Sequence, residues 1–249
     1  MDSLLDIIIP VYNEGDNIRR TLDALFTSNR TPFVVHIVYD FDEDNTLPAV
    51  AAWRTDNPAH AARIRLLRNE GRMAHGAVMT GFDRTTAPAV LMFPADDDFN
   101  LGIVDRLHAR FADDGCDIVC ASRFIPGGCM KGCPWLKAVL VRCAAFTLHH
   151  VARIPTHDAS NGFRLFSRRV LDTIPVESSE GFTYSIELLV KAHERGLRIG
   201  EVPARWYERS RGSSRFRVLK WLPAYLRWYV YGMRVAYRRL IGGGRRVAR

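Results

Sequence analysis

The sequence predicts an α/β domain with a Rossmann-like, mainly parallel sheet and helices on both faces. Short apolar runs alternate with segments of helical periodicity over the first hundred residues, which is the order expected of a parallel, doubly wound sheet. The first run, residues 4–10, is almost continuously apolar, as in a strand that is buried on both faces. A chain of 249 residues is also long enough for one such domain with a substantial core.

Each expected element follows from its local pattern. Residues 14–26 predict a helix because Ile18, Leu22 and Leu25 recur at helical spacing. The other expected helices are residues 47–55, 74–82, 135–152 and 187–195. The expected strands are residues 4–10, 33–38, 64–67, 89–93, 117–122 and 199–202. Residues 124–133 are rich in Gly and Cys and predict a mobile loop.

Positive charge gathers at the C-terminal end. The formal net charge is +8, yet residues 205–249 hold thirteen Lys and Arg against one acid, so the rest of the chain is mildly acidic. From residue 216 onward, Trp and Tyr interleave with Arg, which favours contact with an anionic membrane surface. A helix packed on the domain is the alternative, and the two are compatible. We therefore expect a catalytic domain over residues 1–215 and a basic, aromatic helical tail over residues 216–249.

The sequence also indicates a location. The first residues carry an acid and run straight into a strand, so no signal peptide is expected. No run of about 18 uncharged apolar residues predicts a spanning helix. The five cysteines lie between Cys116 and Cys143, and without an export signal we expect reduced thiols. These features favour a cytoplasmic protein that is peripheral at the cytoplasmic face of a membrane.

Three consecutive acids, Asp96, Asp97 and Asp98, follow the fourth expected strand. Ligands of such sheets bind beyond the carboxyl ends of the strands. Neighbouring carboxylates repel one another, and a divalent cation among them removes that cost. Mg²⁺ or Mn²⁺ held by Asp96 and Asp98 can neutralise the diphosphate that leaves a nucleotide sugar. The alternative is that the acids cap the helix expected to start near Leu101.

Two earlier strand ends carry groups that suit a nucleoside. Residues 10–14 read Pro-Val-Tyr-Asn-Glu, and Glu14 can hydrogen-bond a base or a ribose. Residues 39–46 place Asp40 after the second strand, where a carboxylate can accept an N–H of uracil or guanine. Because parallel strands end at one edge of the sheet, these loops are expected to share a site with Asp96.

Six blocks in the same order resemble the family 2 glycosyltransferases, most nearly the dolichyl- and polyprenyl-phosphate sugar synthases. The blocks are residues 10–14, 39–46, 94–96, 122–124, 157–164 and 209–215. The resemblance implies a GT-A fold and a metal-dependent hexosyltransferase. Its donor would be a GDP- or UDP-linked sugar, its acceptor a polyprenyl phosphate, and its cofactor Mg²⁺ or Mn²⁺, with inversion at the sugar.

The resemblance also implies a role for each matching position. A phosphate acceptor is already an anion, so it needs positive charge and alignment more than a strong base. Arg supplies bidentate donors for that purpose. The nucleotide-sugar residues would be Pro10, Tyr12, Glu14, Asp40, Asp96, Arg209 and Arg215, with Asp96 and Asp98 on the metal. The acceptor phosphate would meet Arg123 and Arg164, with Arg142 as a further candidate, and the catalytic set would be Asp96, Asp98, Arg123 and Arg164.

The chain departs from the family pattern at Tyr39, Phe41 and Pro94, so the base and the sugar stay open. An acceptor without a phosphate would need a general base, for which Asp98 and Asp158 are candidates. A nucleic-acid-binding module that uses the basic tail is disfavoured, because the acid-lined strand ends would repel a polyanion. A dinucleotide-dependent dehydrogenase is disfavoured too, because no Gly-x-Gly-x-x-Gly follows the first strand.

Overall fold

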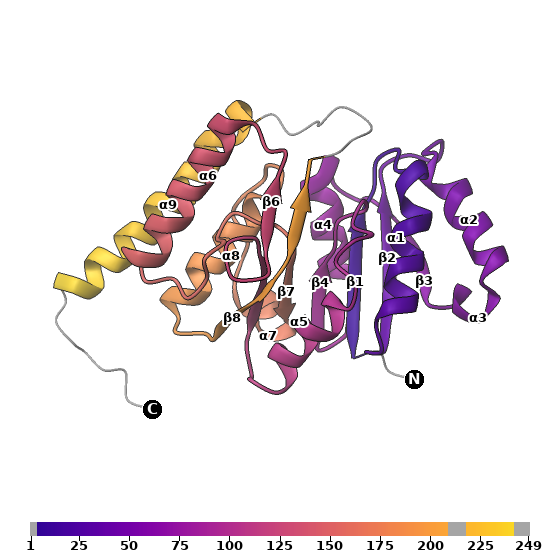
Figure 1. Cartoon of the computed structure of the whole chain (residues 1–249), viewed down its shortest axis with the longest axis horizontal. Helices are drawn as coiled ribbons and strands as arrows, with labels where there is room; N and C mark the ends of the chain where they lie inside the picture. The colour runs from indigo at the N-terminus through magenta and orange to yellow at the C-terminus, as the bar shows by residue number, and fades with distance from the viewer. Residues whose placement is uncertain (1–3, 209–217, 242–249) are drawn as a thin grey trace.

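The computed structural model describes residues 4–208 and 218–241, in which seven strands form a central sheet covered by helices (Figure 1). The strand order is β3-β2-β1-β4-β7-β5-β8, and every neighbouring pair is parallel except those of β7, which runs antiparallel to β4 and β5. The strands are β1 Leu5–Pro10, β2 Phe33–Tyr39, β3 Ile64–Arg68, β4 Ala89–Met92, β5 Ile118–Ser122, β7 Arg164–Ser167 and β8 Ile199–Pro203. A separate two-stranded sheet pairs β6 Cys129–Lys131 with β9 Arg205–Tyr207.

Helices bury both faces of the central sheet. One apolar cluster joins α1 and α5 to the sheet through residues such as Ile18 and Leu107, and a second joins α4 and α8 through Val78 and Leu188. The helices are α1 Gly15–Ser28, α2 Thr46–Asp56, α3 Pro58–Ala61, α4 Met73–Arg84, α5 Ile103–Ala112, α6 Trp135–His150, α7 Arg168–Thr173, α8 Thr183–Glu194 and α9 Val218–Ile241. The predicted α/β class with its mainly parallel sheet is confirmed.

Three local expectations were wrong. The segment expected to be only a mobile loop, residues 124–133, contains strand β6, whose backbone pairs with β9. The helix expected from residue 187 begins at Thr183. Its first turn is buried and includes Ser185, a polar residue that hides the apolar pattern of a buried helix. Strand β7 was not anticipated, since four residues are too short a run to show a period.

The register sets four strand ends along one edge. Pro10 of β1 stands opposite Val38 of β2, and Tyr39 opposite Arg68 of β3. On the other side of β1, Ile8 stands opposite Met92, the last residue of β4. Because these strands are parallel and nearly level, the loops that follow them meet at the same edge of the sheet.

The C-terminal helix α9 packs on the domain. Trp228 and Val235 are buried, and Gly232 lets α9 approach α6 and α8, since a Cβ there would lie 3.2 Å from Leu148 and 3.1 Å from Val190. The expected tail therefore includes a packed helix, while residues 209–217 and 242–249, with the expected boundary at residue 215, lie outside the described part. Within the described residues, no helix has both the length and the apolarity needed to cross a membrane.

Acid should weaken the fold through Asp6 of β1. Its buried carboxylate meets His36 Nε2 at 3.1 Å and accepts the backbone N–H groups of Thr86 and Ala87 at 2.9 Å. Burial alone would raise the pKa of Asp6, but these hydrogen bonds outweigh it and lower the pKa from 3.8 to about 2. Between those values the unfolded chain takes up a proton that the folded protein refuses, so stability is lost as the pH falls.

We expect Asp6 to account for about 2 kcal/mol of the fall in unfolding free energy between pH 5 and pH 2. Urea unfolding at a series of pH values measures it. The Asp6→Asn protein should show a flatter profile in this window, and an unchanged slope would contradict the assignment.

Candidate active site

Asp44 fastens the loops after β1 and β2 together. Its buried carboxylate accepts the backbone N–H of Asn13 at 3.1 Å and that of Thr46 at 2.8 Å. The Thr46 hydroxyl donates to Asp44 and accepts the N–H of Glu14 at 2.9 Å. Asn13 has a φ of 55°, a left-handed conformation that Asn adopts more readily than most residues. The first loop is thus held in one shape, with Glu14 at its end.

Helix α1 starts in direct contact with the second loop. A Cβ on Gly15 would lie 2.7 Å from the carbonyl oxygen of Asn45, closer than a side chain can come. The Gly15 N–H donates to Asn45 Oδ1 at 2.9 Å. Glycine at this position is therefore what allows the two loops to touch.

Two aromatic rings lie at the end of the edge where a nucleoside is expected. Tyr12 is 47% exposed, and its ring meets that of Phe41 edge-on with centroids 5.3 Å apart. Pro10 ends β1 beside them. The two rings offer an apolar wall with Tyr12 open to a ligand, so the structure brings Pro10 and Tyr12 together with the second loop as expected.

The two carboxylates expected at the nucleoside are each oriented by an amide. Asp40 accepts a hydrogen bond from Asn69 Nδ2, which also donates to the Met73 carbonyl at 3.1 Å. Glu14 accepts one from Asn17 Nδ2 at 2.8 Å. Asp40 is thereby tied to the loop after β3, and Glu14 to the first turn of α1.

The three consecutive acids have different environments. Asp97 points inward: Asn100 donates to it through its backbone N–H at 3.0 Å and through Nδ2 at 2.6 Å. Burial raises the pKa of Asp97 to about 6, against the effect of the hydrogen bonds from Asn100. Asp97 therefore shapes the turn before α5, while Asp96 and Asp98 remain partly exposed. The alternative that the acids cap α5 is wrong, because the N-cap of α5 is Gly102, which has no capping side chain.

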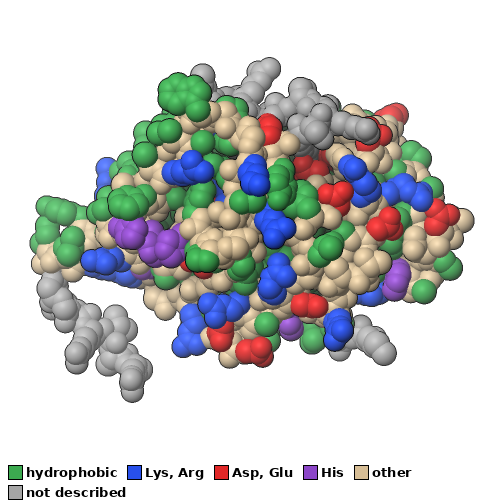
Figure 2. Space-filling view, in the orientation of Figure 1, with side chains coloured by type: hydrophobic (Ala, Val, Ile, Leu, Met, Phe, Trp, Pro, Cys, Tyr) green, Lys and Arg blue, Asp and Glu red, His purple; other side chains and the backbone are tan. Residues whose placement is uncertain are grey.

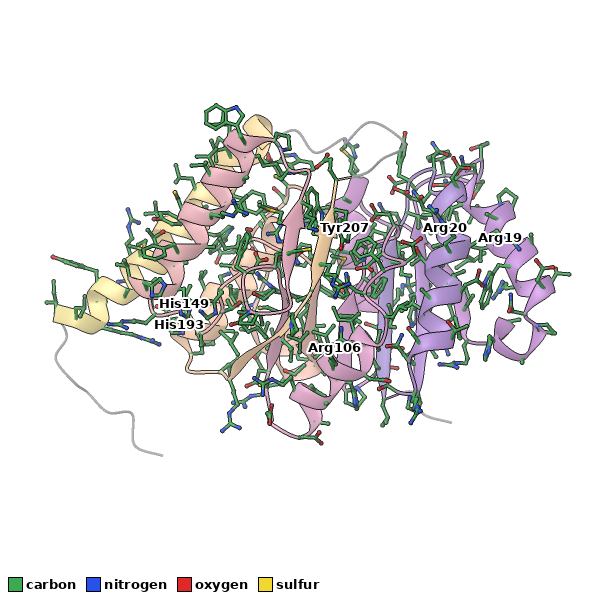
Figure 3. All side chains as sticks on the ribbon, in the orientation of Figure 1. Arg19, Arg20, Arg106, His149, His193 and Tyr207 are labelled. Atoms are coloured by element: carbon green, nitrogen blue, oxygen red, sulfur yellow. The ribbon has the colours of Figure 1, made fainter. Side chains whose placement is uncertain are left out.

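Contacts along α1 join the loop with residues 96–98, the acid loop, to Glu14 in the loop after β1. Arg20 Nε lies 3.5 Å from Asp98 Oδ2, and Arg20 Nη2 donates to Asn17 Oδ1 at 3.1 Å. Asn17 in turn holds Glu14. One edge of the sheet therefore carries the four acids Glu14, Asp40, Asp96 and Asp98. Figure 3 labels Arg20, which contacts Asp98, and Tyr207, which contacts Phe99.

Asp96 and Asp98 have the chemistry for a divalent cation. Carboxylate oxygens are the ligands that Mg²⁺ and Mn²⁺ prefer. Over residues 4–208 and 218–241, no three His, Cys, Asp or Glu side chains gather closely enough to hold a metal by themselves. Two carboxylates fit a cation that takes its other oxygens from a substrate diphosphate and water, which is the usual situation of Mg²⁺.

A buried ion pair lies at the carboxyl end of β5. Arg123 Nε donates to Asp158 Oδ2 at 2.7 Å and Nη2 to Oδ1 at 2.8 Å, with side chains 9% and 0% exposed. Arg123 also donates to the Ser160 hydroxyl at 2.9 Å. Burial would raise the pKa of Asp158, but the charge and hydrogen bonds of Arg123 outweigh it and lower that pKa. This bidentate pair fixes the plane of the guanidinium group.

The structure places Arg164 differently from the expectation. It begins β7, is fully buried, and donates to the carbonyl groups of Ser185 and Asp158. Among the residues that the structure describes, its Nε and the Tyr184 hydroxyl are buried and find no hydrogen-bond partner. A side chain enclosed in this way does not meet an acceptor directly in this structure, so Arg164 supports the segment that carries Asp158.

Of the remaining predicted arginines, Arg142 lies in the described part of the chain. Arg142 is exposed on α6, where Ala138, Ala145 and Leu148 form the inward face. It therefore points away from the domain, contrary to a contact with acceptor phosphate beside Arg123. Arg209 and Arg215 lie outside the described residues, and their assignment to the diphosphate stays a prediction.

Strand β9 links the acid loop to α6. Asn100 Nδ2 donates to the Arg205 carbonyl at 2.9 Å, and the Arg205 N–H donates to Asn100 Oδ1 at 2.8 Å. Lys137 at the start of α6 lies 5.4 Å from the ring centroid of Trp206. One short strand thus connects the turn around Asp97 with the helix at the end of the molecule.

The sequence matches a known protein family. The profile described as "Glycosyl transferase family 2" matches residues 6–174, more than half of the chain. The chain belongs to this family. Polyprenol monophosphomannose synthase of Mycolicibacterium smegmatis is 28% identical over 233 residues, covering 86% of this chain and 85% of the relative. An uncharacterized glycosyltransferase of Mycobacterium bovis is 27% identical over 210 residues, covering 84% of this chain and 88% of the relative.

Solved structures show the fold of this glycosyltransferase. Glucosyl-3-phosphoglycerate synthase of Mycobacterium tuberculosis, in complex with Mn²⁺, UDP and glucosyl-3-phosphoglycerate, aligns with a TM-score of 0.65 at 16% identity. The alignment covers 94% of this chain and 80% of that one. The complex of the same enzyme with Mn²⁺, UDP-glucose and phosphoglyceric acid gives 0.64. The GT-A prediction is confirmed.

Two residues that shape the site of this glycosyltransferase were not assigned from the sequence. Asp44 fastens the first two loops, and Asn69 orients Asp40. The Asp-Asn-Thr order of residues 44–46, directly before a helix, was the available signal for Asp44. Asn69 had no such signal, because its role depends on β2 and β3 being neighbours.

Proposed function

We propose that this family 2 glycosyltransferase moves a hexose from a GDP- or UDP-linked sugar to a polyprenyl phosphate, with inversion. The observation that carries the proposal is a shared edge: carboxylates after β1, β2 and β4 lie on one side, and the oriented guanidinium group of Arg123 after β5 lies on the other. The name of the mycobacterial relative, polyprenol monophosphomannose synthase, makes mannose the first sugar to test.

On the donor side, Glu14 and Asp40 accept hydrogen bonds from the base and ribose, and Tyr12 covers the nucleoside. Asp96 and Asp98 hold Mg²⁺ or Mn²⁺, which neutralises charge on the departing diphosphate. Arg209 and Arg215 are proposed to hold the same diphosphate. Donor selectivity between uracil and guanine falls to the loop with Asp40 and Phe41.

On the acceptor side, Arg123 aligns the phosphate. Its Nη1 faces Met130 Sδ at 3.6 Å, a weak acceptor that a phosphate oxygen would replace. A phosphate oxygen attacks the anomeric carbon from the face opposite the diphosphate. The new C–O bond forms as the bond to the diphosphate breaks, and the configuration inverts.

Transfer to an acceptor without a phosphate is the second candidate, and it needs a general base. Asp158 is fully buried and bound by Arg123, which lowers its pKa and makes it a weaker base. Asp98 is close to Arg20. Both environments favour the acceptor that is already an anion. Nucleic acid is not a proposed partner.

We further propose that the protein works at the cytoplasmic face of an anionic membrane, where a polyprenyl phosphate presents its head group. The basic and aromatic residues 216–249 are the proposed attachment.

A donor and acceptor screen tests the function. Thermal shift with Mn²⁺ and GDP- or UDP-sugars should single out one donor, because binding stabilises the fold by an amount that grows with the logarithm of concentration over Kd. That donor should then give product with a polyprenyl phosphate and none with the matching polyprenol. Equal transfer to both lipids would overturn the phosphate acceptor and favour a general base.

A further inference from the structure

Helix α6 turns its large apolar side chains outward. Trp135, Leu136 and Phe146 are 77%, 55% and 62% exposed, and Val139 and Leu140 are 49% and 42% exposed. At about 100° per residue, positions 135, 136, 139, 140 and 146 all fall on one face of the helix. The opposite face, which packs on the domain, carries Ala138, Ala145 and Leu148. A helix on a globular domain normally has the reverse arrangement.

Helix α9 lies beside α6 at the same end of the molecule (Figure 1). Thr147 Oγ1 and the Tyr229 hydroxyl are 2.9 Å apart where the two helices touch. Leu222 and Leu226, one turn apart on α9, are 40% and 52% exposed. Hydrophobic and basic side chains gather over this end in Figure 2.

Basic side chains outnumber acidic ones at this end, where Arg227 and Arg238 pair with Glu177 and Glu194. Neither α6 nor α9 contains an Asp or Glu. Exposed basic side chains flank the apolar face: Arg142 on α6, and Arg227 and Arg238 on α9, whose side chains are 60% and 69% exposed. Apolar groups bordered by Arg, with Trp among them, match the boundary between lipid headgroups and acyl chains.

We propose that the outward face of α6, made of Trp135, Leu136, Val139, Leu140 and Phe146, is the surface that enters an anionic lipid bilayer. This rests on the proposed function and deepens it, since it adds α6 as the inserting element beside the basic residues 216–249. In this arrangement α9 supports α6 from behind and contributes the basic border. The occupant is a lipid surface because a second copy of the chain would bring the same excess of positive charge from α6 and α9 to the interface.

The docking face connects with the active site. Lys137, at the start of α6, lies over Trp206 of β9, and β9 is hydrogen-bonded to Asn100 in the acid loop. Phe99 and Tyr207 add a ring contact with centroids 5.0 Å apart. Insertion of α6 thus sets the height of the site edge above the bilayer, where a lipid-borne phosphate has to reach Arg123.

Co-sedimentation of the full chain with vesicles tests the surface without any donor or acceptor. We compare phosphatidylcholine vesicles with and without phosphatidylglycerol. Leu136→Ser and Phe146→Ser should each weaken binding to the anionic vesicles about tenfold, since each removes a large apolar group from the acyl boundary. Leu101→Ser is the matched control, because Leu101 is equally exposed, at 57%, in the turn before α5, and it should bind like the original protein.

Three results would overturn the proposal. Unchanged binding of Leu136→Ser and Phe146→Ser would remove α6 from the contact. Equal binding to vesicles with and without phosphatidylglycerol would remove the basic border. A dimer in light scattering that the α6 substitutions dissociate, without vesicle binding, would assign the face to a second copy.

Turnover separates this proposal from the proposed function. With a short, water-soluble polyprenyl phosphate, Leu136→Ser should retain the original rate, because the face acts only through the membrane. If no polyprenyl phosphate is a substrate, the proposed function fails while the vesicle results still decide the docking face.

Discussion

The Asp96→Asn protein is expected to keep its fold and to lose turnover by a factor on the order of 10² to 10³. Asp96 lies in the partly exposed loop after β4, at the edge shared with Glu14 and Asp40. In the proposed reaction its carboxylate holds the cation that stabilises charge on the diphosphate, a contribution of this size when one electrostatic group is removed. Initial rates with saturating Mn²⁺ and the donor from the screen measure the loss.

Stability and a distant acid provide the controls. The Tm should stay within a few degrees, because removing a partly exposed carboxylate costs little. Asp113→Asn, at the exposed C-terminal end of α5, should leave both rate and Tm unchanged. A rate near that of the original protein in Asp96→Asn, with Mn²⁺ still required, would move the metal site away from this loop.

The three consecutive acids show how much of the site could be predicted from the sequence. Three adjacent carboxylates after an apolar strand placed a charged cluster correctly, because strand ends in a parallel sheet converge. The sequence did not say that the middle acid turns inward. That depends on Asn100, which reaches across to Arg205, a partner 105 residues away. Pairings of that length leave no local pattern.

The arginines show what the sequence could not predict, namely how deeply a side chain is buried. Family resemblance put Arg123 and Arg164 together at the acceptor, and the structure does bring both to Asp158. It also buries Arg164 completely. A motif tells which residues recur, but the depth of a side chain depends on the packing above it, here by Ser185 at the start of α8. The exposure of Arg142 could not be predicted for the same reason, because the weak periodicity of α6 did not decide which of its faces packs on the domain.

The fold itself was more predictable than its details. Continuous apolar runs and helical spacing gave the order of elements through β4, since each run is local. Strands β6, β7 and β9 are three or four residues long. Each of them forms because another strand offers its backbone hydrogen-bonding groups as a partner. That pairing depends on the assembled fold and leaves no pattern in the sequence of the strand itself.

Breaking the buried pair should give the largest stability effect. Asp158→Asn leaves the charge of Arg123 almost buried and without its carboxylate, which costs about 3–5 kcal/mol. For a domain of this size that corresponds to a fall in Tm of about 10 °C. Urea unfolding measures the free energy. Asp114→Asn breaks the exposed Arg110–Asp114 pair, whose side chains are 48% and 44% exposed, and should cost less than about 1 kcal/mol.

Replacing both Arg123 and Asp158 separates the contribution of the ion pair to stability from the role of Arg123 in the reaction. In Arg123→Met with Asp158→Leu, apolar side chains of similar size fill the space of the ion pair, and such exchanges are often neutral or stabilising. We expect the double variant to recover most of the stability lost in Asp158→Asn, while turnover stays low and KM for the polyprenyl phosphate stays raised at unchanged donor affinity. Recovery of turnover together with stability would mean that Arg123 only braces the fold, and the acceptor phosphate would then have to be met by another cation at this edge.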